Sequence, residues 1–498
     1  MKKRIINLIK IALFAAVVLA CIVVAATVVR RKESNDKYAD FFTQAEKGNI
    51  DVLFMGSSHM INGVNPASLY KDYGITSYNM GGHGSVMQAT YWELIEALDY
   101  CSPKWVVVDA YMLEKNYQYL DVMNENTPQE DIDTSIDQLH LNMDCWPLNR
   151  LKLAAISDLI QDKEIRKEFL FDFIVYHDRW NELTKEDYQV LSGQNASNKL
   201  LGGELRYEVE LKPSTSPDPA EGEQLSEHTV GQEYLMKIID ECQRRGIGVL
   251  VTYLPFCPTT EDKIAANSAG VVAGMYDVPY INMLGLGIID VYTDLNDTGH
   301  LNALGAKKVT DYLGNWLVAT GDLEDHRGQA GYEYYDECAA RYAEDMRNFS
   351  GSVNNLYSQL ELLNFGDVGS VVYFNQGSGS FADASVKELV AQITGTDKIK
   401  ILSDGPYIMI NDAGSGNVYE ASGEEALSGV ATAMGTMVYQ PVEQRFRFLY
   451  AQENEEVNYL YDDDHIWYDI QVITYDKNSG EVLSHKYYRS YGSKYRED

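Results

Sequence analysis

Residues 51–59, which read Asp51-Val52-Leu53-Phe54-Met55-Gly56-Ser57-Ser58-His59, decide the fold. A short apolar run that ends in glycine and small turn residues, ahead of a helical pattern, predicts a strand, a loop and a helix in succession. Four further apolar runs follow the same scheme, with helix-like stretches between them: 75–80, 105–110, 247–254 and 279–283. Alternating strands and helices predict an α/β domain whose parallel sheet is covered by helices on both faces.

The rest of the chain is organised around this domain. The third and fourth runs lie more than a hundred residues apart, which is too far for a simple crossover between parallel strands. We therefore expect a long insertion that forms a cap over one edge of the sheet. The predicted parts are the α/β domain (51–320), its cap insertion (about 113–230), a helical connector (321–365) and a smaller β-rich domain (366–498).

The β-rich domain is indicated by a shift in composition towards Gly, Ser, Tyr and Val near residue 366. Two strand-like runs, 466–475 and 481–490, flank a glycine-containing turn, and this pattern predicts a hairpin.

The N-terminal end has the pattern of a membrane anchor. An uncharged, mostly apolar run extends from Ile11 to Val29 and is followed by three basic residues. At about 1.5 Å per residue, a helix of this length is close to the hydrocarbon thickness of a bilayer and exceeds the usual core of a signal peptide. We expect residues 1–32 to be a cytoplasmic tip and an uncleaved single-pass anchor in the cell membrane, with the bulk of the chain extracytoplasmic. A polar linker is expected at 33–50. Cleavage after Ala26 and lipid attachment at Cys21 remain alternatives.

Composition excludes several classes of protein. The 498 residues are 45% hydrophobic and 23% charged, as in folded globular chains, which excludes whole-chain disorder. Asp and Glu number 74 against 41 Lys and Arg, so the formal net charge is −33. This charge repels a phosphate backbone, and nucleic acid is therefore excluded as a partner. The same charge disfavours adhesion to anionic lipid or to a polyanionic polymer unless a local basic patch overrides it.

Three polar motifs follow predicted strands, at the sheet edge where α/β proteins bind ligands. Ser58 lies in the first turn, where amides at the start of a helix can stabilise an oxyanion. The second strand ends in a glycine-rich loop, 79–85, which exposes backbone amides. After the last strand Asp297 precedes His300, so its carboxylate can accept from Nδ1 of the imidazole and leave Nε2 facing the serine. Helix caps and tight turns explain each motif alone, but all three in this order predict nucleophilic catalysis by serine.

With these motifs the sequence resembles the SGNH, or GDSL-type, hydrolase superfamily over roughly residues 50–320. The resemblance implies a flavodoxin-like three-layer α/β/α domain with a Ser…Asp-x-x-His triad. Gly56-Ser57-Ser58 is similar to the first sequence block of that family, which implies that Ser58 is the nucleophile. The last block implies that His300 is the general base and Asp297 its orienting partner.

The loop after the second strand resembles the second block of the family. This similarity implies oxyanion or binding roles for Asn79, Gly82 and Gly84, with the amides of Gly84 and Ser58 as donors. The third block, Gly-x-Asn-Asp, is not present, because residues 106–111 read Val-Val-Val-Asp-Ala-Tyr. No residue is therefore assigned to the asparagine donor of that block.

The anchor, the Gly-x-Ser turn and Asp-x-x-His together are similar to a membrane-anchored branch of the superfamily. It contains the D-alanyl transfer protein of teichoic acid modification and alginate O-acetylation proteins, and it implies acyl transfer outside the membrane alongside a membrane-bound O-acyltransferase. We therefore expect a serine O-acyltransferase or carbohydrate esterase that acts on O-acyl groups of a cell-surface glycan, with acetyl as the expected group and without cofactor or metal. The alternative is a non-catalytic scaffold in which a degenerate SGNH domain binds glycan or a partner.

Lesser candidates lie elsewhere in the chain. Residues 176–180 cluster a cation, an imidazole and an indole, so His177, Arg179 and Trp180 are candidates to line the site from the cap, with packing inside the cap as the alternative. The acidic run 461–465 is interpreted as a solvated turn because it lacks the ligand spacing of an EF-hand.

Overall fold

The structure is a computed structural model that describes most of the chain. The described residues are 2–31, 33–115, 128–192, 197–210, 212–440, 445–449, 456–458, 468–491 and 494–497. The acidic run 461–465 lies outside them.

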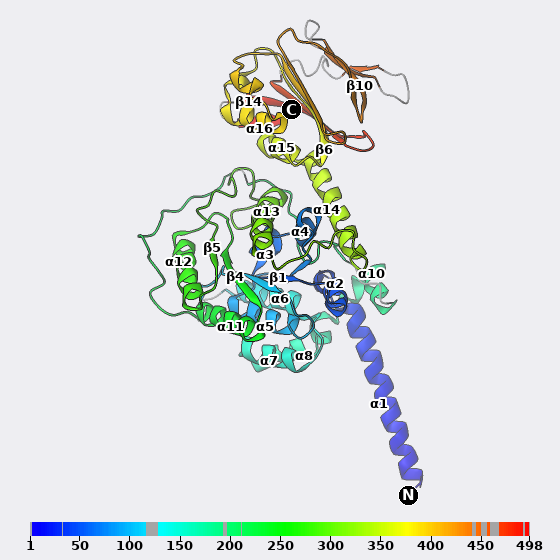
Figure 1. The fold of residues 1–498 in the computed structure, drawn as a ribbon. Coiled ribbons are helices and arrows are strands. Elements are labelled where there is room, and N and C mark those ends of the chain that lie inside the picture. Colours follow the sequence, from blue (N-terminus) through cyan, green and yellow to red (C-terminus); the bar gives the residue numbers. More distant parts are fainter. Residues whose placement is uncertain are drawn as a thin grey trace.

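A five-stranded parallel sheet forms the centre of the first domain (Figure 1). Its spatial order is β2-β1-β3-β4-β5, and every neighbouring pair is parallel. All five predicted strands are confirmed: β1 (Val52–Met55), β2 (Ser77–Asn79), β3 (Trp105–Asp109), β4 (Gly248–Tyr253) and β5 (Tyr280–Asn282).

Helices cover both faces of this sheet, as the sequence predicts. They are α3 (Ser58–Gly63), α4 (Pro66–Tyr73), α5 (Met87–Ala97), α11 (Val230–Arg245), α12 (Thr260–Met275) and α13 (Ala303–Thr320). Alternate residues of β1 divide between two apolar cores: Leu53 and Met55 pack in one core, and Val52 and Phe54 in the other. Side chains that alternate between two covered faces produce the continuous apolar runs seen in the sequence.

The insertion between β3 and α11 is mostly helical. Its elements are α6 (Gln129–Met143), α7 (Arg150–Leu159), α8 (Lys163–Leu170), α9 (Phe173–Tyr176), the 3-10 helix η1 (Arg179–Asn181), α10 (Lys185–Gln189) and the 3-10 helix η2 (Val190–Ser192). An extended strap, residues 197–210, follows them. The amide of Glu204 donates to the carbonyl of Ile61 in α3, and that of Glu210 to the carbonyl of Leu295 after β5, so the strap ties α3 to the loop that follows β5.

The N-terminal helix α1 (Lys2–Val29) contains an apolar stretch, Arg4–Val29, within which an 18-residue segment has a mean hydropathy of 2.9. It is long and apolar enough to span a membrane, and a signal sequence has the same properties. The polar linker expected at 33–50 is wrong for most of its length, because residues Glu33–Lys47 form helix α2. Tyr38, Phe41 and Ala45 of α2 are buried in the core of the first domain.

Two helices lead from the first domain to the second (Figure 1). In α14 (Glu333–Ser352), Tyr342 and Phe349 pack in the core of the parallel-sheet domain. In α15 (Leu356–Asn364), Leu360 packs in the core of the C-terminal domain. Leu362 of α15 still packs in the core of the first domain, so α15 contacts both cores, and the change from one core to the other begins about ten residues before the shift in composition.

The C-terminal domain is rich in antiparallel β-structure. A six-stranded sheet has the order β15-β14-β13-β6-β7-β8 and a four-stranded sheet the order β12-β11-β10-β9. The strands are β6 (Val368–Phe374), β7 (Tyr407–Asp412), β8 (Asn417–Ser422), β9 (Leu427–Thr432), β10 (Gly435–Gln440), β11 (Arg445–Leu449), β12 (Glu456–Asn458), β13 (Ile470–Asp476), β14 (Val482–Tyr491) and β15 (Lys494–Glu497). The helices are η3 (Gly379–Ala382), α16 (Ala384–Thr394) and α17 (Lys398–Ile401). Strands β13 and β14 form the predicted hairpin.

Candidate active site

The turn between β1 and α3 separates the roles of two adjacent serines. Gly56 has a φ of +151°, and a Cβ there would lie 3.0 Å from the Cβ of Asp109, so only glycine fits this turn without strain. Ser57 is the N-cap of α3, and its hydroxyl accepts from the amide of His59 at 3.2 Å. Ser58 is the first residue of the helix, and its hydroxyl is left to face the loop after β5.

The loop after β5 brings a histidine to this serine. Nε2 of His300 lies 2.9 Å from Oγ of Ser58. Nδ1 of His300 lies 2.8 Å from Oδ1 and 3.1 Å from Oδ2 of Asp297. The three side chains predicted from the sequence therefore form one hydrogen-bonded chain, although 242 positions separate Ser58 from His300.

Asp297 is held as the ionised partner of this chain. Besides the imidazole, its Oδ1 accepts from the amides of Gly299 and His300, each at 2.9 Å, and its Oδ2 accepts from Nδ2 of Asn296 at 3.1 Å. Burial alone would raise the pKa of Asp297, but the hydrogen bonds from His300 and Gly299 outweigh it and hold this pKa below the usual value. A charged carboxylate here fixes the proton of His300 on Nδ1 and leaves Nε2 as an acceptor.

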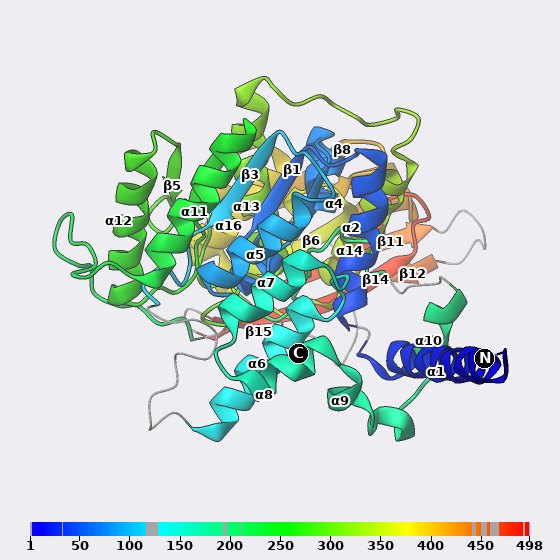
Figure 2. The ribbon, with the colours of Figure 1, turned by 90° about the horizontal axis from the view of Figure 1, so that it is seen from below.

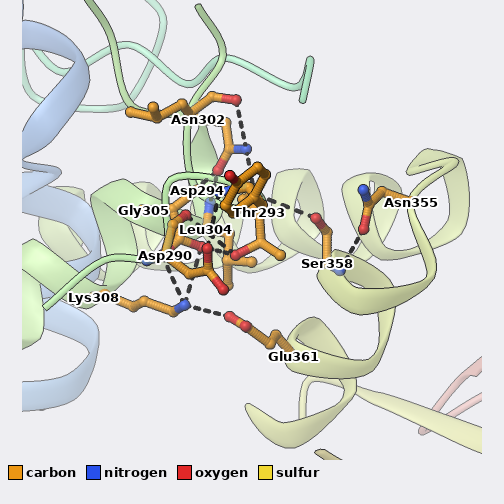
Figure 3. Close-up of polar contacts among 12 residues, drawn as sticks. Asp290, Thr293, Asp294, Asn302, Leu304, Gly305, Lys308, Asn355, Ser358 and Glu361 are labelled. Carbon is orange, nitrogen blue, oxygen red and sulfur yellow. Dashed lines mark hydrogen bonds and ion pairs between the residues drawn. The ribbon is translucent and has the colours of Figure 1, made fainter. Parts of the chain in front are cut away.

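The loop that carries these residues is braced from behind by α13 and α15 (Figure 3). Asn302 caps α13 and donates to the carbonyl of Thr293 at 2.8 Å. Nζ of Lys308 lies 2.8 Å from the buried carboxylate of Asp294 and also pairs with Glu361 of α15. Burial raises the pKa of Asp294. The pKa of Lys308 is also raised, because the carboxylates of Asp294 and Glu361 outweigh the effect of burial on the lysine.

The glycine-rich loop contributes one free amide rather than three binding groups. Asn79 is fully buried, and its Nδ2 donates to the carbonyls of Met60 and Val64, each at 2.8 Å. The amide of Gly82 donates to the carbonyl of Gly56 at 2.8 Å. Asn79 and Gly82 therefore hold the loop against the nucleophile turn, and the expectation that they bind the substrate is wrong. Gly84 lines the same cavity as Ser58, and its amide has no hydrogen-bond acceptor among the described residues.

Helix α6 of the insertion reaches this loop, which no motif in the sequence indicates. The carboxamide of Asn142 accepts from the amide of His83 at 2.9 Å and donates to its carbonyl at 2.8 Å. One turn earlier, Gln138 lies so close to Gly84 that a Cβ built on the glycine would be 2.0 Å from Oε1. Because α6 is polar over most of its length, its pattern does not show which carboxamide faces the site.

The site opens into a cavity of about 340 Å³. It is lined by Ser58, His59, Gly84, Val86, Tyr111, Met112, Ser135, Gln138, Gly299 and His300. His59 stacks on Tyr111 with ring centroids 3.6 Å apart, and its ring centroid is 5.7 Å from that of His300. Burial, together with the adjacent His300, lowers the pKa of His59 to about 3, so this imidazole is a neutral wall of the cavity.

At the end of β3, where the resemblance to SGNH proteins lacks an asparagine, the chain has a buried carboxyl group. Oδ1 of Asp109 accepts from the amide of Leu254 at 2.9 Å, and Oδ2 has no hydrogen-bond partner among the described residues. Burial raises the pKa of Asp109 to about 7, although the amides of Leu254 and Tyr111 oppose the shift. Asp109 is not among the residues that line the cavity.

The three candidate cap residues do not line this cavity. Nη1 of Arg179 donates to the carbonyl of Val29 at 2.5 Å, and His177 and Trp180 are exposed beside the end of α1. The cluster belongs to the part of the insertion that packs on the N-terminal helix, because α9 and α10 contact α1. The expectation that they face the substrate is therefore wrong, and Ser135 and Gln138 of α6 take that place.

Comparison with known proteins adds no assignment. The chain matches no protein-family model, and it matches no curated protein. The functional argument therefore rests on the residues and on their geometry.

Proposed function

We propose that the chain is a membrane-anchored serine acyltransferase of SGNH type that moves an acyl group, with acetyl as the expected group, through an ester on Ser58 to a hydroxyl of a cell-surface glycan. The observation that carries the proposal is the hydrogen-bonded chain from Oγ of Ser58 to His300 and on to Asp297, at the mouth of a cavity. A non-catalytic scaffold has no use for a serine, an imidazole and a carboxylate aligned in this order.

The fold supports the same proposal. The strand order β2-β1-β3-β4-β5 is that of flavodoxin-like sheets, in which ligands bind at the carboxyl ends of the strands. Ser58 follows β1, Gly84 lies in the loop after β2, and His300 lies in the loop after β5. This arrangement agrees with the SGNH resemblance of the sequence motifs.

The two half-reactions use the same proton acceptor. Oγ of Ser58 transfers its proton to Nε2 of His300 as it attacks the acyl carbonyl carbon, and the carbonyl electron pair moves onto the oxygen. When the intermediate collapses, the donor's leaving group departs with the proton from Nε2, and an ester remains on Ser58. The acceptor hydroxyl then gives its proton to Nε2 and attacks that ester, and Ser58 leaves with the proton.

The oxyanion of each intermediate needs donors that are not already used. The amides of Ser58 and Gly84 meet this condition within the described residues. We assign the third donor to the carboxamide of Gln138, which packs on Gly84 and takes the place of the asparagine missing after β3. Fixed donors of this kind stabilise charge that develops only during the reaction.

The acyl donor, on this proposal, is supplied from within the membrane, which suits an enzyme held there by α1 and a membrane-bound O-acyltransferase as partner. The acceptor is a neutral glycan, because a net charge of −33 slows encounter with a polyanion.

The test is acylation of the full-length protein in detergent micelles by p-nitrophenyl acetate, followed by intact mass and peptide mapping. We expect one acetyl group on Ser58. Ser58→Ala should abolish the adduct, because it removes the oxygen that carries the ester, and His300→Ala should slow its formation by about 10³-fold or more; both should leave the fold intact. Ser57→Ala is the matched control, since it removes a neighbouring hydroxyl that caps α3 and should retain the adduct.

Two outcomes would redirect the proposal. If the folded protein forms no adduct on Ser58, the scaffold alternative gains and the acyl-enzyme is abandoned. If the adduct forms but is released only to water, with no transfer to oligosaccharide hydroxyls, the protein is an esterase of the same O-acyl groups.

A further inference from the structure

Exposed apolar side chains are concentrated in one part of the insertion. Among the described residues outside α1, twelve large apolar side chains are at least half exposed, and seven of them lie within residues 148–191. Five of these seven lie on or beside α9, η1, α10 and η2. We call these five the interfacial patch: Phe171, Ile174, Trp180, Tyr188 and Leu191.

The elements that carry the interfacial patch pack on the last turns of α1 (Figure 2). Arg30, directly after α1, forms an ion pair with Asp172, and Arg179 donates to the carbonyl of Val29. Val28 and Val29 are buried by these contacts, whereas nearly all of the preceding part of α1 is exposed. The patch is therefore fixed at the level of the C-terminal end of α1.

That level corresponds to a bilayer surface if α1 spans a membrane. The uncharged run from Ile11 to Val29 extends over about 28 Å as a helix, close to the roughly 30 Å of a hydrocarbon core. Its end at Val29 then lies at the boundary between acyl chains and headgroups. Side chains held beside Val29 lie in the headgroup layer or just below it.

The composition of the patch suits this layer. Trp and Tyr concentrate at membrane interfaces, and surface elements bury apolar side chains about 5–10 Å into the boundary between headgroups and acyl chains. Residues 148–191 contain seven Lys and Arg against nine Asp and Glu, a net charge of −2 in a chain that carries −33. This charge is close to the chain average for a segment of this length, so we expect the apolar and aromatic side chains of the patch, and not its charge, to carry the contact with lipid.

We propose that the interfacial patch is a second membrane contact, which dips into the lipid headgroup layer beside α1 and fixes the orientation of the first domain over the bilayer. The occupant of the patch is the lipid surface itself. The proposal requires α1 to be in the membrane and is independent of the acyl-transfer chemistry.

The test uses the full-length protein in vesicles of phosphatidylcholine with a minor fraction of phosphatidylglycerol. The fluorescence of Trp180 is isolated as the difference between the wild type and Trp180→Phe. Lipids with brominated acyl chains should quench most of this difference signal, and aqueous iodide should quench little of it. Vesicles of the same composition without brominated lipid give the unquenched reference.

A matched control comes from Met275 on α12, whose exposed fraction of 67% equals that of Trp180. In a Trp180→Phe background, Met275→Trp should be quenched by iodide and not by brominated lipid. If Trp180 behaves as this control does, the patch does not enter the bilayer and the proposal is overturned. A protein partner would then be the remaining candidate to cover it.

Discussion

At the scale of single residues, a polar group can take part in the site only if other residues do not already use its hydrogen bonds. Ser57 and Ser58 are chemically identical, yet the hydroxyl of Ser57 is used to cap α3 and that of Ser58 contacts His300. The same distinction separates Asn79, whose carboxamide is fully used by backbone groups, from Gln138, whose carboxamide packs against Gly84. The sequence motif names all the polar residues of a loop, but only the contacts show which are available.

The role of Asp297 can be tested without changing the shape of the site. Asp297→Asn retains an oxygen but removes the charge that keeps the proton of His300 on Nδ1. We expect the rate of acetyl-Ser58 formation to fall by about 10³–10⁴-fold with an unchanged fold. Stopped-flow release of p-nitrophenol measures this rate. A loss smaller than tenfold would mean that the carboxylate does not orient the imidazole.

The proposed role of Gln138 as a hydrogen-bond donor to the oxyanion gives a second prediction at the scale of residues. Gln138→Ala should lower the acylation rate by about 10²-fold, and Gln138→Glu should lower it at least as much, because a carboxylate repels the oxyanion. Ser135→Ala, on the cavity-lining face of the same helix, is the control and should change the rate little. If both Gln138 variants acylate at the wild-type rate while Ser58→Ala does not, the amides of Ser58 and Gly84 suffice.

The raised pKa of Asp109 predicts that the free energy of unfolding falls as the pH rises. An unfolded aspartic acid loses its proton near pH 4, whereas the folded protein holds this proton up to about pH 7. Between these values the folded state binds more protons, so the free energy of unfolding falls as the pH rises and levels off above pH 7. This difference in pKa between the two states corresponds to a loss on the order of 4 kcal/mol.

Comparing the wild type with Asp109→Asn separates the effect of Asp109 from that of His59. The lowered pKa of His59 makes the free energy of unfolding rise with pH, and this contribution is the same in both proteins. The variant keeps an acceptor for the amide of Leu254 and has no proton to lose. We expect its free energy of unfolding to exceed that of the wild type by an amount that grows from pH 4.5 to pH 7. Urea denaturation across this range measures the difference, and parallel curves for the two proteins would show that Asp109 ionises normally.

At the scale of elements, the five strands and the order of the motifs could be predicted because continuous apolar runs ending in glycine are typical of strands buried on both faces. Helix α2 could not be separated from a linker by its polar composition, although Tyr38, Phe41 and Ala45 recur at helical spacing. The partners of the cap residues could not be predicted either. Arg179 and Trp180 have side chains that often bind glycans, and only the folded insertion shows that Arg179 instead bonds to the end of α1 and that Trp180 is exposed.

The ion pairs of Lys308, which join α13 to Asp294 and to α15, are expected to stabilise the loop that carries His300. Lys308→Met leaves the carboxylate of Asp294, whose side chain is fully buried, without its cation. We expect the free energy of unfolding to fall by about 3 kcal/mol. Lys167→Met on α8 is the control, because both partners of its ion pair with Glu164 are more than half exposed, and it should cost less than about 1 kcal/mol. Equal effects in the two variants would show that these ion pairs do not hold the loop.

At the scale of the whole molecule, charge and attachment act on the same encounter. The chain has at one end an apolar helix long enough to span a membrane, and α14 leads to the second domain at the other (Figure 1). The net charge of −33 creates a negative field around the whole protein, and on the proposed function an approaching polymer meets this field before it reaches Ser58 and His300. The triad alone does not select between a neutral and an anionic acceptor, and we expect this field to disfavour the anionic one.

Salt should therefore separate the two classes of acceptor. Raising the ionic strength from about 0.01 M to 0.15 M shortens the Debye length from about 30 Å to about 8 Å, which removes most long-range repulsion between the protein and a polyanion. We expect transfer of acetyl from Ser58 to a polyanionic glycan to accelerate with salt, and transfer to a neutral glycan of similar length to stay constant. The measurement is the rate at which Ser58 loses its acetyl group after each polymer is added to the preformed acetyl-enzyme. A polyanion that reacts faster than the neutral glycan at low salt would show that a local basic surface, rather than the net charge, governs the encounter.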